Sequence, residues 1–199
     1  MVASSVKKLL NAFTNGTTAA FGNMIAKNET EILKRRFCEF ELLVYFVSTF
    51  LFTVAAIMFS SFIGLYTHGV TDVNYYRPSL VITMCLAEYL LCVRIPYEQL
   101  VFAAGRFKET RNGAFIEATI NLLISIVSVN YIGLTGIMLG TVCSSLYRLM
   151  QYSTFLSKEV IERPIGSTTI KLLYSAFVSV IAFFFCRALP MAGITGYLS

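Results

Sequence analysis

Long apolar segments are the feature that most limits what this chain can fold into. One of them, over residues 40–66, reads FELLVYFVSTFLFTVAAIMFSSFIGLY. A helix needs about 20 apolar residues to cross the hydrocarbon core of a bilayer, which is ~30 Å thick. Similar segments predict further spans over residues 79–104, 113–131, 133–155 and 168–189. The predicted fold is all-α, a polytopic transmembrane bundle of about five spans.

The composition agrees with a membrane protein. Of the 199 residues, 56% are hydrophobic and 14% are charged, whereas a soluble domain of this length needs more polar side chains to cover its surface. The net charge of +5 does not indicate nucleic acid, because the basic residues occupy short loops instead of one continuous stripe. Membrane lipids are the expected surroundings.

Three parts of the chain are distinguished by their pattern. Residues 1–36 carry apolar side chains at helical spacing but are too polar to span alone. They are either an amphipathic helix lying on the membrane surface or the tail of a further span. Residues 37–190 form the transmembrane bundle, and residues 191–199 form a tail.

The charges of the loops predict the orientation. Basic residues gather before the first span and in every second loop, and the intervening loops hold few. The rich segments contain Lys27, Lys34, Arg35 and Arg36, then Arg106, Lys108 and Arg111, then Lys158, Arg163 and Lys171. By the positive-inside rule, we expect a multi-pass protein of the inner (plasma) membrane, with its N-terminus in the cytoplasm and its C-terminus outside.

The second predicted span carries charges that lipid disfavours. A charged side chain at the centre of a transmembrane helix costs about 2.5 to 3.5 kcal/mol on insertion scales. Arg94 and Glu98 are four residues apart and can pair; they either line a cavity or reach the headgroups near the cytoplasmic end. Glu88 lies deeper, and we expect it to face inward. Pro96 cannot donate a backbone hydrogen bond, so a bend is expected there.

The third predicted span has a polar stripe on one face. Glu117, Asn121, Ser125 and Ser128 follow each other at steps of four, four and three residues. For the two serines we favour hydrogen bonds that hold helices together. For Glu117 and Asn121 we favour a cavity wall.

In the fourth span, Gly136, Gly140 and Ser144 form a ridge of small residues that lets a neighbouring helix approach closely. Arg148 follows it, and we expect this side chain to snorkel toward the headgroups. Tyr45, Ser48 and Thr49 in the first span make a weak polar patch.

Catalysis and metal binding have little support in the sequence. His68 is the only histidine, and the five cysteines form no CxxC pair and fit as small apolar fillers. No nucleotide-binding or nucleophile motif is present. We therefore expect no enzyme, no catalytic residue, no metal site and no cofactor.

Several sequence segments resemble those of the polysaccharide-biosynthesis flippases, which belong to the multidrug/oligosaccharidyl-lipid/polysaccharide exporter superfamily. They occur in order: FSSFIGLYTHGVTDVNYYRPSL, EYLLCVRIPYEQLVFAAGRFKETR and IEATINLLISIVSVNYIGLTGIMLGTVCSSLYR. The resemblance covers roughly residues 16 to 156. It implies a bundle around a central cavity that moves a lipid-linked oligosaccharide across the membrane by alternating access, in lipopolysaccharide or capsule biosynthesis.

The chain also departs from this family in one large way. Family members have twelve or fourteen spans, and five are predicted here. The chain therefore resembles a segment of the second half, and we expect an N-terminal half or partner subunit to complete it. Glu88, Arg94, Glu98, Glu117 and Asn121 are the candidate cavity residues, although no family motif assigns them to a ligand. The alternatives are a cation-coupled multidrug exporter segment and a truncated remnant that does not transport.

Overall fold

The computed structural model describes the backbone of residues 16–66, 78–161, 163–164 and 166–188, and the side chains of residues 16–58, 79–161, 163–164, 166–182. Every regular element in these ranges is a helix, which confirms the predicted all-α class. A helical segment over residues 16–26 precedes the labelled helices. These are α2 (Thr30–Tyr66), α3 (Pro78–Val93), α4 (Ile95–Ala103), α5 (Phe107–Ile132), α6 (Leu134–Glu159) and α7 (Gly166–Ala188).

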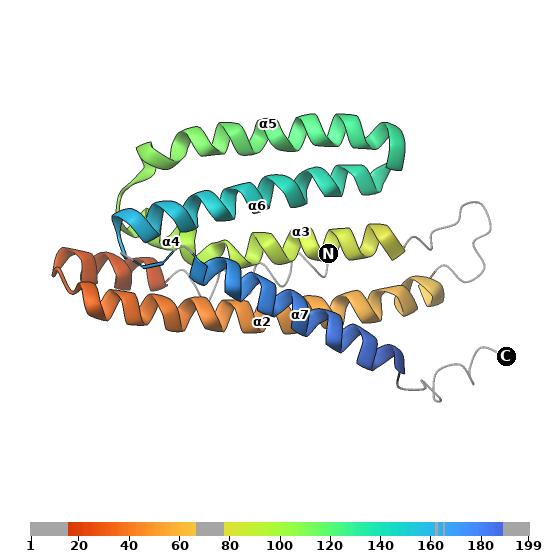
Figure 1. Cartoon of the computed structure of the whole chain (residues 1–199), viewed down its shortest axis with the longest axis horizontal. Coiled ribbons are helices and arrows are strands. Elements are labelled where there is room, and N and C mark those ends of the chain that lie inside the picture. The colour runs from red at the N-terminus through yellow and green to blue at the C-terminus, as the bar shows by residue number, and fades with distance from the viewer. Residues whose placement is uncertain (1–15, 67–77, 162, 165, 189–199) are drawn as a thin grey trace.

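The helices run up and down along one long axis, each antiparallel to the one before it, except that α4 continues the direction of α3 (Figure 1). Helix α6 packs against α5, α3 and α4, and α2 packs against α3, α4 and α7. One end of the bundle holds the first residues of α2, α5 and α7 and the last residues of α4 and α6 (Figure 1). The three basic segments of the sequence lie at this end, which we call the basic end.

Helix α5 shows why this bundle belongs in a membrane. Its polar stripe faces α6, while its apolar side chains are exposed all around the rest of the helix; Phe115 is 69% exposed and Leu122 is 61% exposed. Its most apolar stretch contributes no buried residue. A helix that turns polar side chains to its neighbours and apolar side chains outward exposes too much apolar surface for water. The same arrangement suits a helix surrounded by lipid.

Among the described residues, three helical stretches are long and apolar enough to cross a membrane: Thr30–Met58, Ser79–Ala103 and Phe107–Ile132. They correspond to the first three predicted spans, and they indicate a membrane protein. The fourth predicted span is helix α6, whose threonine, serine and arginine side chains make it less apolar. The fifth is α7, whose described side chains form a shorter apolar stretch over Gly166–Ala182.

The core lies where α2, α3, α4 and α6 meet. Phe37, Leu90, Tyr97 and Leu149 are fully buried there. The helix is interrupted at Arg94, directly between α3 and α4, and the predicted bend there stays a prediction. Pro96 follows in the first turn of α4, where its missing N–H is tolerated.

Helices α5 and α6 form a hairpin with a very close contact. Gly133 joins them with φ 63° and ψ −139°, a conformation that an L side chain rarely adopts. A Cβ atom placed on Gly136 would lie 2.4 Å from the carbonyl carbon of Ser128, and one on Gly140 would lie 2.2 Å from the Ser125 hydroxyl. The predicted small-residue ridge is therefore confirmed as the contact surface for α5.

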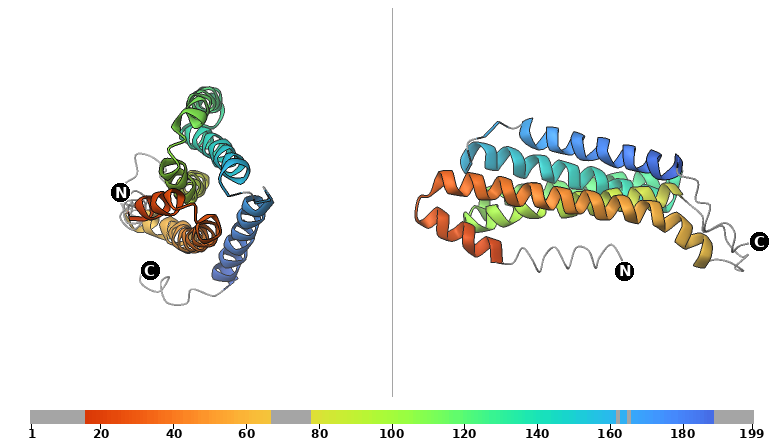
Figure 2. Two further views of the ribbon diagram at one scale, coloured as in Figure 1. Left: turned by 90° about the vertical axis from the view of Figure 1, so that its left-hand side faces the viewer. Right: turned by 90° about the horizontal axis from the view of Figure 1, so that it is seen from below.

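The segment over residues 16–26 folds back along the start of α2 (Figure 2). Asn28 turns the chain with φ 56°, which asparagine tolerates better than most residues. Phe21 is 3% exposed and its ring lies 6.2 Å from that of Phe37. Residues 1–15 lie outside the described residues, so both predictions for the N-terminal segment, a surface helix or the tail of a further span, stay open. The tail over residues 191–199 and His68 also lie outside them.

Candidate functional site

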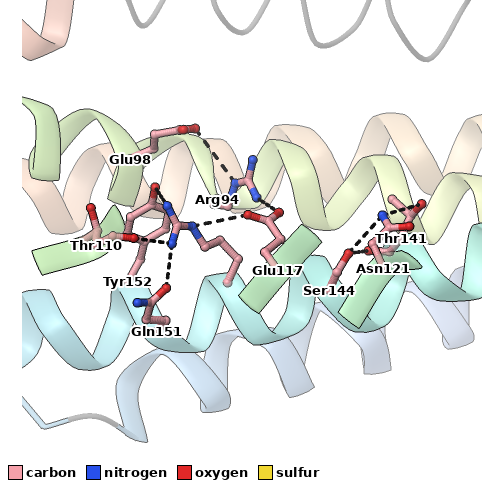
Figure 3. Close-up of polar contacts among 10 residues, drawn as sticks. Arg94, Glu98, Thr110, Glu117, Asn121, Thr141, Ser144, Gln151 and Tyr152 are labelled. Atoms are coloured by element: carbon pink, nitrogen blue, oxygen red, sulfur yellow. Dashed lines mark hydrogen bonds and ion pairs between the residues drawn. The ribbon is translucent and has the colours of Figure 1, made fainter. Parts of the chain in front are cut away.

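Two guanidinium groups converge on one carboxylate between three helices. Arg94 lies at the α3–α4 junction, Glu117 in α5 and Arg148 in α6. Arg94 Nη1 donates to Glu117 Oε1 at 2.5 Å, and Arg148 Nε lies 3.4 Å from Glu117 Oε2. Glu98 is the outermost member, with Oε2 4.0 Å from Arg94 Nε. We call these four residues the Arg–Glu cluster (Figure 3).

The cluster lies deep along the helices. Arg94 is nine residues from Ala103, Glu117 is ten residues from Phe107 and Arg148 is eleven residues from Glu159. At 1.5 Å per residue, all three lie roughly 14 to 16 Å from the basic ends of their helices. Their side chains are 16%, 23% and 7% exposed. Three charges from separate helices therefore meet at one depth.

Arg148 is held on every side. Nη1 donates to the carbonyl oxygen of Thr110 and to Gln151 Oε1, both at 2.7 Å. Nη2 donates to the Tyr152 hydroxyl at 2.8 Å, and the guanidinium lies 4.3 Å from the centre of that ring. The prediction that Arg148 snorkels to the headgroups is wrong, because its donors are satisfied within the bundle. This residue fixes the position of Glu117.

Arg94 is held less completely. Its Nη1 reaches Glu117, but its buried Nε has no hydrogen-bond partner among the described residues, since Glu98 lies beyond hydrogen-bond distance. The predicted Arg94–Glu98 pair is thus the weaker of the two contacts of Arg94. The guanidinium of Arg94 therefore has a spare donor, and the carboxylate of Glu117 beside it also pairs with Arg148. Such a guanidinium can bind another anionic group, and a phosphate matches the geometry of its N–H donors.

Asn121 belongs to a separate polar group between α5 and α6 (Figure 3). Its Nδ2 donates to Thr141 Oγ1 at 3.5 Å and to Ser144 Oγ at 3.4 Å, and its Oδ1 accepts from Ser125 Oγ at 3.2 Å. Ser125 Oγ also donates to the carbonyl oxygen of Ile137 in α6 at 3.3 Å, which confirms its predicted role in interhelical hydrogen bonding. These contacts hold the α5–α6 hairpin together, and a cavity role for Asn121 stays a prediction.

Glu88 lies in α3, away from both groups. Its side chain is half-buried. Within the described part of the chain it makes no ion pair or hydrogen bond; Cys85 is its electrostatic neighbour. The structure therefore does not bring Glu88 to the Arg–Glu cluster, and its predicted inward-facing role stays a prediction.

A second cluster, which the sequence interpretation missed, surrounds Glu41 of α2. This carboxylate is fully buried. Arg163 donates to it through both terminal nitrogens, Nη1 to Oε2 at 2.6 Å and Nη2 to Oε1 at 2.9 Å. Lys171 Nζ lies 2.5 Å from Oε2, and the Tyr97 hydroxyl donates to Oε1. We call these residues, with Thr168, the Glu41 cluster.

The Glu41 cluster joins four parts of the bundle. Thr168 of α7 accepts from Arg163 Nη2 and from the Tyr97 hydroxyl, both at 3.1 Å, and lies 2.6 Å from Ser153 of α6. Burial of Arg163, which lies between α6 and α7, lowers the pKa of its guanidinium, but the ion pair with Glu41 raises that pKa by more. The net pKa is above its usual value, so Arg163 stays charged.

The signal for Glu41 was present in the sequence. It is an acid inside an apolar run, the same kind of residue as Glu88, but it stands near the start of the first span and close to Arg35 and Arg36. Arg36 and Arg35 are its nearest cations before it along the chain. The structure instead pairs Arg35 and Arg36 with Glu39, and it pairs Glu41 with residues more than 120 positions away.

Comparison of the chain with models of protein families, with curated proteins and with solved structures finds no match. Within the described residues, no three histidine, cysteine, aspartate or glutamate side chains are grouped so that they can hold a metal ion. The chemistry that these residues offer is therefore that of ion pairs and hydrogen bonds at membrane depth.

Proposed function

We propose that this chain is part of a flippase that moves a lipid-linked oligosaccharide across the inner (plasma) membrane by alternating access, in lipopolysaccharide or capsule biosynthesis. The observation that carries the proposal is the Arg–Glu cluster, in which two guanidiniums share the carboxylate of Glu117 inside the bundle. A lipid-linked sugar of this kind carries an anionic diphosphate, and a transporter must shield that charge from the acyl chains.

Arg94 is the residue that we assign to the diphosphate. Within the part of the chain that the structure describes, its Nε has no hydrogen-bond partner. Its contact with Glu117 is exchangeable because Arg148 also balances that carboxylate. Arg148 is a positioning residue, since its donors are already taken. When no substrate is bound, the carboxylate of Glu98, whose side chain is 32% exposed, balances part of the charge of Arg94.

The proposal includes a partner and an orientation. The five predicted spans give one wall of a transport chamber, and a partner subunit or further segment supplies the opposite wall. The basic end faces the cytoplasm, because the positive-inside rule favours that side for the lysine- and arginine-rich loops.

Glycan export tests the role of Arg94. The assay uses cells in which the chain complements an export defect together with its partner, and it measures surface glycan against protein abundance in the membrane. Arg94→Ala should lower export at least about tenfold, a loss of roughly 1.4 kcal/mol of transition-state stabilisation. Arg94→Lys should be intermediate, because lysine keeps the charge but not the fork.

Arg106→Ala is the matched control. This residue is exposed and pairs with Glu109 at 3.1 Å, outside the cluster, so its loss should leave export unchanged. Full export by Arg94→Ala at normal abundance would remove Arg94 from the substrate path and, with it, the observation on which the proposal depends.

A cation-coupled exporter of small molecules is the second candidate, and Glu88 is the observation that favours it. A half-buried carboxylate without an ion pair among the described residues can bind a proton or sodium ion. Dye efflux separates the two functions. Efflux that Glu88→Gln abolishes, with glycan export unaffected throughout, would replace the flippase proposal with this one.

A further inference from the structure

Helix α7 is attached to the rest of the bundle unevenly. Its packing partner is α2, and it crosses α2 obliquely (Figure 2). The face that it turns to the bundle carries Thr168, Lys171, Ser175 and Ser179, at steps of three, four and four residues. Its opposite face is apolar and exposed, with Leu173 at 69% and Phe177 at 62%.

Beyond the basic end, the side-chain hydrogen bonds that the described part of α7 makes to other helices join hydroxyl groups. Ser175 Oγ lies 2.6 Å from the Tyr89 hydroxyl of α3, and Ser179 Oγ lies 3.0 Å from Thr53 Oγ1 of α2. Interhelical hydrogen bonds of this type average only about 0.6 kcal/mol in a membrane protein. They hold the helix in register but separate easily.

The attachment at the basic end is of a different kind. Both cations of the Glu41 cluster come from α7 or from the residues just before it, and both bind one fully buried carboxylate of α2. Separating them exposes opposite charges for which the described residues offer no other ion pair. The strongest contact of α7 is therefore concentrated at one end, with weak contacts beyond it.

We propose that the Glu41 cluster is a latch that keeps this end of the bundle closed: α7 swings away from α2 only when Arg163 and Lys171 release Glu41. The latch rests on the alternating access of the proposed function, in which each side of the membrane opens in turn. It adds the helix that moves and the contact that must break.

Thiol accessibility tests the latch without any transport assay. The background replaces the native cysteines Cys38, Cys85, Cys92, Cys143 and Cys186 with alanine. Ser175→Cys is the reporter, because Ser175 is 6% exposed and lies beyond the latch along α7. The rate of labelling by a membrane-impermeant maleimide is measured in membrane vesicles with the basic end accessible, with and without Glu41→Gln.

Glu41→Gln should raise the labelling rate of the reporter at least about tenfold. Glu39→Gln is the matched control, since Glu39 pairs with Arg35 and Arg36 at the surface of the same helix, and it should leave the rate unchanged. Equal rates in the two variants would overturn the latch. This outcome is independent of export by Arg94 variants, so the latch and the flippase proposal fail separately.

A second reporter and a second variant guard against unfolding. Ser144→Cys in α6, 1% exposed, should remain unlabelled in Glu41→Gln; labelling of both reporters would show general loosening and would also overturn the latch. Lys171→Met keeps the two-nitrogen contact of Arg163 with Glu41 and should raise labelling of Ser175→Cys by less than Glu41→Gln does. No effect of Lys171→Met would contradict a shared latch.

Discussion

Replacing Glu117 with glutamine should destabilise the bundle, because two guanidiniums depend on this one carboxylate. Removing one partner of a buried ion pair costs about 3 to 5 kcal/mol. The side chains of Arg94 and Glu117 are 16% and 23% exposed, so water screens part of this cost. Glutamine also keeps one acceptor oxygen. We therefore expect a loss of about 2 kcal/mol, or roughly a 30-fold change in the unfolding equilibrium constant.

The assay is reversible unfolding in mixed micelles, followed by circular dichroism since the chain has no tryptophan. Glu109→Gln is the control: Glu109 pairs with Arg106 at 3.1 Å, but both side chains are more than 40% exposed, so the unfolding midpoint should stay the same. The double variant Glu117→Gln with Arg94→Gln should recover part of the loss, because it removes one uncompensated charge.

The reasoning is refuted if Glu117→Gln unfolds at the same denaturant concentration as Glu109→Gln. It is also refuted if the losses of the two single variants of Arg94 and Glu117 simply add. Additivity would mean that the two groups do not interact, although the structure places their atoms 2.5 Å apart.

Three further predictions concern the packing of α5 and α6. Gly136→Ala should lower stability by about 1 to 3 kcal/mol, because its Cβ would lie 2.4 Å from the Ser128 carbonyl carbon, whereas Gly166→Ala meets no atom within 4 Å and should leave the unfolding midpoint unchanged. Asn121→Ala should cost no more than about 1 kcal/mol, since its interhelical hydrogen bonds are 3.4 to 3.5 Å long; a larger loss in the same unfolding assay would contradict this. Arg148→Lys should destabilise by about 2 kcal/mol, because lysine cannot serve Thr110, Gln151 and Tyr152 together, and a thermal midpoint equal to that of the parent would count against it.

The fold was predictable because lipid leaves few choices. Segments of about 20 apolar residues must be helices in a bilayer, so their number and direction can be inferred from hydropathy and loop charge. The interruption at Arg94 was predictable for a local reason, since Pro96 lacks an N–H. The Gly136 and Gly140 ridge was predictable because small residues at four-residue spacing let backbones approach.

The partners of the charged residues were only partly predictable. Spacing along one helix finds pairs such as Arg94 and Glu98, but the shorter contact of Arg94 is with Glu117 of another helix. The partners of Glu41 lie in a loop and a helix far along the chain. The positive-inside rule counts every arginine and lysine in a loop, whichever way its side chain points. The rule therefore cannot show that the side chain of Arg163 turns into the bundle.

The central claim is that charged side chains at membrane depth face a wet chamber and not the acyl chains. Labelling of Glu88→Cys and Leu123→Cys by a membrane-impermeant thiol reagent, in the cysteine-free background, tests it most directly. Leu123 is 58% exposed on the outer face of α5. The account predicts rapid labelling at position 88 and none at position 123. Labelling at neither position, or at position 123 alone, would contradict it.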